Sequence, residues 1–292
     1  MHNGTVWELP FNEQAVLELH TEYGTLSVLP VEPGHSPRLE LSRSSSENVE
    51  VHVDKLGDVV RVALDPHSGF NWFYPGGWEC RATLYVPRDV RAALETNAGS
   101  VNVRNLDGCE LGIKANAGKI DLVDVYGLMH LAADAGSITG RGLGGAFDVQ
   151  AQAGSVRLEI LDLQPGEHRM RATMGSVRIE LARGMDVCIE THTSLGSVRN
   201  NYPVRADAPV RLALSTEMGS IRVEESGIPR ATRRPSGSRD AQADVAEGPA
   251  RSTDAARPAR EDPELERILK MVEAGELSAK DADELLRAMG RV

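Results

Sequence analysis

A glycine-rich stretch, "GRGLGG", is the first segment of the sequence whose residue types could bind a cofactor. Gly140, Gly142 and Gly145 match the G-x-G-x-x-G pattern of dinucleotide-binding proteins. That site needs a helix directly after the glycines, because the helix N-terminus holds the pyrophosphate. The segment that follows, "AFDVQAQAGSV", instead alternates apolar and polar residues as a strand does. We therefore expect no nucleotide site here and no cofactor in the protein.

Carboxylates are the next candidates for chemistry, because β-helical polysaccharide lyases and hydrolases carry acidic residues on one outer face. The candidates are Asp107, Asp121, Asp124 and Asp134, and three histidines lie in the same part of the chain, His130, His168 and His192. Neither set keeps a constant position relative to the repeating glycines of the chain, so neither would form one column. The sequence predicts a protein that is not an enzyme.

A glycine recurs along the chain with neighbours of constant type. The repeated residues are Gly24, Gly99, Gly118, Gly136, Gly154, Gly175, Gly196 and Gly219, and the last seven are spaced 19, 18, 18, 21, 21 and 23 apart. An aliphatic residue stands two positions after each glycine, and Thr or Ala stands three positions before it. This period of two on both sides of a glycine predicts strand, turn, strand, with the glycines at structural turns.

Units this short cannot fold alone, so the copies must stack on one another. We predict a mainly β fold, a right-handed β-solenoid of the single-stranded β-helix type, over residues 91–227. An antiparallel sandwich or barrel of hairpins is the alternative. Residues 1–90 hold one repeat and several alternating segments, with Gly57-Asp58 a hairpin turn, and are expected to form an antiparallel β cap.

One segment of the cap region is unusually aromatic. The stretch "PHSGFNWFYPGGWEC" contains Phe70, Trp72, Phe73, Tyr74 and Trp78. Such a loop could stack on sugar rings, contact a membrane interface or bind another subunit. The favoured role is a hydrophobic plug that closes the N-terminal end of the solenoid. If the rings are exposed, the segment is the candidate partner or ligand loop.

The C-terminal part has a different composition. Residues 228–262 are rich in Ala, Arg, Pro, Ser and Gly and predict a disordered linker. Residues 263–290 predict a helical hairpin, since Asp262 is a good N-cap, Pro263 suits the first helical position, and apolar residues recur at helical spacing. The expected docking face consists of Leu265, Ile268, Leu269, Val272, Leu285, Leu286 and Met289. A hairpin this small should need a partner surface, or it folds back on its own solenoid.

Composition excludes several classes of function. The 32 basic and 43 acidic residues give a net charge of −11, which disfavours binding to nucleic acid. The three cysteines form no C-x-x-C pair, so the sequence predicts neither a metal site nor a disulfide framework. No signal peptide or membrane span is visible, which indicates a cytoplasmic location, with peripheral association to the envelope left open.

The repeats give the chain a family resemblance. The segment "LYVPRDVRAALETNAGSVNVRNLDG" and the copies after it resemble the bacterial "putative adhesin" family (domain of unknown function 4097) over roughly residues 15 to 225. The segment "LKMVEAGELSAKDADELL" is similar to the short SHOCT-like helical modules that accompany that family. The resemblance implies a β-solenoid without known catalysis, an association of some members with envelope stress, and a docking or oligomerisation role for the hairpin.

We accordingly expect a non-catalytic scaffold for protein–protein interaction or self-assembly, in an envelope- or stress-related bacterial system. Its partner would be another protein, or a second copy of the chain, bound through the C-terminal hairpin. The alternative is a carbohydrate-binding or carbohydrate-cleaving surface protein of the adhesin type.

Overall fold

The computed structural model describes residues 5–12, 14–42, 45, 49–66 and 80–230. The chain divides into two units, Met1–Ser238 and Arg239–Val292, and every described residue belongs to the first unit. Ten β-strands form one connected sheet in this part, which confirms the prediction of a mainly β fold.

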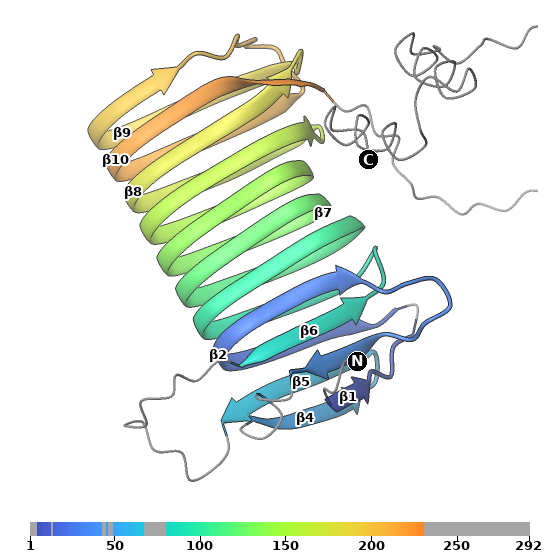
Figure 1. The fold of residues 1–292 in the computed structure, drawn as a ribbon. Helices are drawn as coiled ribbons and strands as arrows, with labels where there is room; N and C mark the ends of the chain where they lie inside the picture. Colours follow the sequence, from blue (N-terminus) through green and yellow to red (C-terminus); the bar gives the residue numbers. More distant parts are fainter. Residues whose placement is uncertain (1–4, 13, 43–44, 46–48, 67–79, 231–292) are drawn as a thin grey trace, which may run out of the picture. The chain divides into compact units, whose positions relative to one another are not determined.

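The main feature of the fold is a stack of parallel coils (Figure 1). It comprises β2 (Val16–Pro30), β7 (Arg91–Leu163), β8 (Gly166–Arg183), β9 (Val187–Asn200) and β10 (Val210–Pro229). Each is parallel to its neighbour, in the spatial order β2, β7, β8, β10, β9. We call the strand around one repeated glycine a coil, so that β7 contributes the four coils of Gly99, Gly118, Gly136 and Gly154.

The repeated glycines form one column at the corner of the coils. All eight have a positive φ, between +112° and +152°, where side-chain-bearing residues are strained. A Cβ on any of the seven from Gly99 onward would overlap the carbonyl oxygen of the glycine stacked against it, for example Gly118 against Gly136. Glycine is therefore required at this corner by both backbone conformation and close approach.

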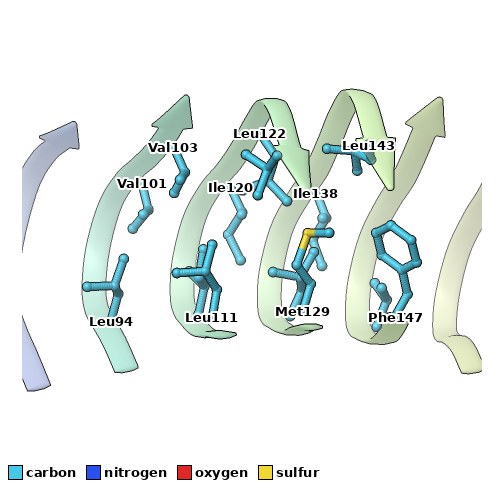
Figure 2. Close-up of a cluster of buried hydrophobic side chains, with 14 of the residues drawn as sticks. Leu94, Val101, Val103, Leu111, Ile120, Leu122, Met129, Ile138, Leu143 and Phe147 are labelled. Carbon is cyan, nitrogen blue, oxygen red and sulfur yellow. The ribbon is translucent and has the colours of Figure 1, made fainter. Parts of the chain in front are cut away.

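The two columns beside the corner face inward and form the core. The residues three positions before the glycines and two positions after them are buried in every coil except that of Gly196. Figure 2 shows the aliphatic side chains of successive β7 coils, such as Val101, Ile120 and Ile138, in line inside the coils. The narrow interior explains why only Thr or Ala occurs on one side of the corner and Val, Ile or Leu on the other.

The N-terminal strands continue the coil of β2 in a different way. Strand β5 (Val59–Pro66) pairs with the half of β2 before its corner, and β6 (Arg81–Val86) pairs with the half after it. Both pairs are parallel. Beyond them the pairing is antiparallel, because β4 (Val49–Leu56) pairs with β5, β3 (Arg38–Leu41) with β6, and β1 (Thr5–Glu8) with β3.

The other end departs from sequential stacking. Strand β10, the last in sequence, lies between β8 and β9, so the coil of Gly196 is outermost (Figure 1). Strand β10 also runs to Pro229, two residues past the expected end of the solenoid at 227, and Arg230 Nε is 2.8 Å from Asp162 Oδ1. The aromatic loop, residues 231–262 of the expected linker and the helical hairpin lie outside the described residues.

Candidate functional site

A groove crosses the outer face of the coils near the N-terminal end and has a volume of about 640 Å³. On β2 and on the four coils of β7, it is lined by the outward-facing side chains four and six positions before the corner glycines. Side chains of β4 and β5 complete the lining. The groove therefore runs along the stack, across seven strand segments. We call it the axial groove.

Small residues make the floor of the axial groove. They are Ala63, Ala93, Gly112 and Ala132. Gly112 has no positive φ, and a Cβ on it would meet nothing closer than the carbonyl oxygen of Ala92 at 3.9 Å. The backbone would thus accept alanine at this position. The missing side chain at Gly112 affects the depth of the groove and not the stacking of coils.

Charged side chains border the floor. Four are acidic (Glu18, Asp54, Glu95, Asp148) and two are basic (Arg61, Lys114), which gives a formal charge of −2 with the histidines neutral. The two cations are already paired, since Arg61 Nε is 2.7 Å from Glu18 Oε2 and Lys114 Nζ is 3.1 Å from Glu95 Oε1. Both pairs join neighbouring strands along the groove.

Three histidines line the same groove, each within 4 Å of a carboxylate. His20 lies 3.2 Å from Glu22 and 3.8 Å from Glu95. His130 Nδ1 is 3.8 Å from Asp148 Oδ2, and His52 Nε2 is 3.7 Å from Glu50 Oε2. The three rings therefore place polar nitrogen atoms among the acidic residues of the border.

A ladder of polar side chains lies beside the groove, two positions before the corner glycines. Asn116 donates to Asn97 at 2.6 Å, and Asn97 donates to Glu22 at 2.8 Å. The hydrogen bond from Asn97, followed by that with His20, lowers the pKa of the Glu22 carboxyl. Two coils further on, Gln152 donates to Asp134 at 2.8 Å. The ladder keeps Glu22 ionised and orders the side chains along this edge.

The residues of "GRGLGG" lie at turns of the coils. Gly142 has φ +67° and approaches the side chain of Asp124, while Gly145 has φ +116° and stacks on Gly127. The backbone remains in strand β7 on both sides, so these glycines open no helix. The pattern therefore reflects two further corners of one coil.

The candidate aspartates are not brought together in one site. Asp107 and Asp124 line a separate cavity of about 290 Å³ with Arg88, Asp121 is 3.6 Å from Lys119, and Asp134 belongs to the polar ladder. Of the candidate histidines, His130 lines the axial groove, His168 is buried, and His192 lines a third cavity. The axial groove itself was not identified from the sequence. Its signal in the sequence is that Ala or Gly is combined with a longer polar residue at the positions six and four residues before Gly99, Gly118 and Gly136.

Two features are absent from the described residues. No group of three or more His, Cys, Asp or Glu side chains in this part of the chain is placed to hold a metal ion. Likewise, none of the helices there is long and apolar enough to cross a membrane.

The C-terminal segment matches a known domain. Residues 263–291 match the model of the SHOCT-like domain, which confirms the resemblance of this segment to SHOCT-like modules. The chain matches no curated protein sequence.

Several solved structures share a low similarity with the chain. A "putative cell adhesion protein" from Clostridium sporogenes has a TM-score of 0.36 and 12% identity, over 77% of this chain and 100% of its own. A "putative adhesin" from Bacteroides fragilis has a TM-score of 0.36 and 12% identity, over 76% of this chain and 98% of its own. A "putative lipid binding protein" from Parabacteroides distasonis has a TM-score of 0.34 and 12% identity, over 77% of this chain and 97% of its own. At these TM-scores the similarities assign no function to the chain.

Proposed function

We propose that the protein is a non-catalytic scaffold, a right-handed β-solenoid of the "putative adhesin" type, which binds an extended, basic segment of another protein in its axial groove. The observation that supports this most directly is the groove itself, with its floor of small residues and its acidic border. The system it serves would be envelope- or stress-related in a bacterium, as the family resemblance implies.

The length of the groove suits an extended chain. Neighbouring strands lie about 4.8 Å apart, so seven strand segments span about 29 Å. An extended peptide rises about 3.3 Å per residue and would cover this distance with about nine residues. The floor at Ala93, Gly112 and Ala132 leaves room for side chains of such a segment.

The charge of the groove favours a basic segment. Asp54 and Asp148 form no ion pair with Lys or Arg among the described residues, and the cations that are present are held by Glu18 and Glu95. Lysine or arginine side chains of a partner would therefore meet Asp54 without displacing a cation, whereas at Asp148 they would compete with Arg169, which lies in register with Asp148 on the neighbouring strand and is attracted to it. The net charge of −11 would further speed the approach of a basic partner.

The residue types in the groove favour a protein partner over a carbohydrate. No Phe, Tyr or Trp occurs among the described side chains that line it. The rings of these three residue types are a frequent platform for sugars. A protein partner is therefore preferred to the carbohydrate alternative for this groove.

The proposal is tested with a labelled nonapeptide of alternating lysine and alanine, its glutamate counterpart and a glycan array. We expect the lysine peptide to bind, more weakly at higher salt, and the glutamate peptide not to bind. Asp148→Asn should weaken binding about two- to fivefold, since exposed ion pairs contribute about 0.2–1 kcal/mol. Glu217→Gln, which lies at a different cavity, is the matched control.

Two results contradict the proposal. Equal binding of the lysine and glutamate peptides would show that the acidic border does not select the ligand. Binding of a glycan that Asp148→Asn and Gly112→Leu both abolish would assign the groove to carbohydrate.

A further inference from the structure

The outermost coil, β9, leaves one edge of the stack without a strand partner among the described residues. Strand β10 pairs with β8 on one side and with β9 on the other, and β9 ends the order of strands. Backbone N–H and C=O groups along such an edge can pair with a further strand. Strands β10 and β8 pair with their own neighbouring strands through an edge of the same kind.

The opposite end of the stack offers no equivalent edge. There the coil of Gly24 is covered by β5 and β6, and the strands beyond them are antiparallel. Cys80 occupies the place against Gly24 where another corner glycine would otherwise stack. Among the described strands, a coil-shaped edge therefore exists only at β9.

The side chains of β9 are more exposed than their counterparts in the inner coils. Val198 is 42% exposed, whereas the aliphatic residue at this position is buried in the other seven coils. Thr191, also exposed, is the one residue of its inward-facing column that is not apolar. The end coil thus has an incompletely covered interior.

Apolar side chains also gather on the outer surface at this end. Met174, Met218 and Leu195 precede the corner glycines of the last three coils and are 48%, 47% and 67% exposed. The four β7 coils carry alanine at this position. We call these three residues the terminal patch. Contiguous exposed apolar residues of this kind indicate an interaction surface.

A positive charge at the edge, that of Arg199, is a second feature of β9. In the inner coils Arg178 Nη2 reaches Glu224 Oε2 on the neighbouring coil at 2.8 Å. Arg199 occupies the same column at the edge, and among the described residues it forms no ion pair, only a 3.5 Å contact with Asn201 Oδ1. Glu190 lies in the other arm of β9, before the corner, where its Oε1 is 3.9 Å from Arg211 Nη1 of β10 in an exposed pair.

We propose that the edge of β9 pairs with β9 of a second copy of the chain, antiparallel and around a twofold axis that passes between Ser194 and Leu195, beside the corner. In this arrangement the arm before the corner of one copy faces the arm after the corner of the other. In this register Glu190 of each copy lies opposite Arg199 of the other, and the two terminal patches meet at the axis. The contact uses the same surface on both copies, so it closes as a dimer. It goes beyond the proposed function, because the axial groove lies at the other end of the stack.

The mass of the full chain in solution tests the pairing. We expect light scattering to give twice the 31.6 kDa of one chain. The double variant Leu195→Lys, Val198→Lys should be a monomer with an unchanged circular dichroism spectrum. Leu128→Lys is the matched control, since Leu128 is 37% exposed on an inner coil, and it should remain dimeric.

Exchange of charges tests the orientation. Glu190→Arg and Arg199→Glu should each weaken the dimer roughly tenfold, because each places like charges opposite one another in both halves of the interface. The two changes in the same chain should restore the dimer, since the contact is self-complementary.

The proposal is overturned if the wild-type chain is a monomer at 100 µM, or if the lysine double variant is still a dimer. A dimer that Leu269→Asp abolishes and the lysine variant does not would place association on the C-terminal segment. None of these results bears on peptide binding to the axial groove, so the two proposals can fail separately.

Discussion

Substitution of a single corner glycine should destabilise the whole stack, and Gly136→Ala is the sharpest case. Gly136 has φ +152°, and a Cβ there would overlap the carbonyl oxygen of Gly118 in the coil beneath it. A side chain therefore meets two separate obstacles, an unfavourable backbone conformation and a collision with backbone atoms. Neither Gly136 nor Gly118 can move alone, since both belong to the continuous ladder of β7.

The magnitude follows from these two obstacles. A non-glycine residue held in this region of φ costs about 1–3 kcal/mol. To bring the added Cβ to ordinary contact the two coils must separate by roughly 1 Å or more, which breaks the neighbouring interstrand hydrogen bonds, since a bond stretched to about 3.6 Å is no longer one. Two buried groups left unpaired would add about 1–3 kcal/mol each. We expect a loss of about 4 kcal/mol or more in the free energy of unfolding.

Two other glycines serve as controls. Gly34→Ala isolates the backbone term, because Gly34 has φ +85° with no atom within 4 Å of an added Cβ, and about 1–2 kcal/mol is expected. Gly112→Ala meets neither obstacle and should be neutral or slightly stabilising. Unfolding in urea, followed by far-ultraviolet circular dichroism, measures all three. If Gly136→Ala costs no more than Gly34→Ala, close stacking of the corners does not limit the residue type and the reasoning is wrong.

Two further predictions concern buried titratable groups. Burial lowers the pKa of His168, which accepts a hydrogen bond from the Phe147 N–H at 3.2 Å, so the folded state resists a proton that the unfolded chain takes up near pH 6.5. Stability should therefore fall as the pH drops from about 6.5 toward the folded pKa, and the urea midpoint of His168→Gln should change less with pH over this range. Burial also raises the pKa of the Cys109 thiol to about 12. Iodoacetamide at pH 8 should therefore modify the partly exposed Cys188 well before Cys109 in the native protein, as measured by peptide mass spectrometry. Equal rates of modification at the two residues would contradict this burial.

The corner glycines and their inward-facing neighbours could be predicted from the sequence because their constraints are local. A positive φ and a narrow interior each restrict the residue type at one position, and the restriction is repeated in every coil. The same pattern excluded a nucleotide site at Gly140, Gly142 and Gly145, since the strand alternation continues directly after them. The additional corners at Gly127 and Gly145 were missed, because only the inner coils share them.

The order of the last two coils was decided by the tertiary structure. Both coils carry the repeat and either could pair with β8, so the local pattern does not distinguish them. The coil of Gly219 supplies Leu214 and Ile221 to the interior, and that of Gly196 supplies Thr191 and Val198. Placing the more apolar coil inside buries more hydrophobic surface and leaves the more polar coil at the edge.

The axial groove likewise depends on the three-dimensional fold. Outward-facing residues are free of packing constraints, so no single coil reveals the role of Gly112 or Ala132. The groove exists only when seven strand segments are brought into register and small side chains on neighbouring strands line up. The sequence by itself determined the unit that repeats, because that unit is set by local backbone conformation and burial. The tertiary structure alone decided which units adjoin, and thereby the groove and the open edge, because those depend on contacts between residues far apart in the chain.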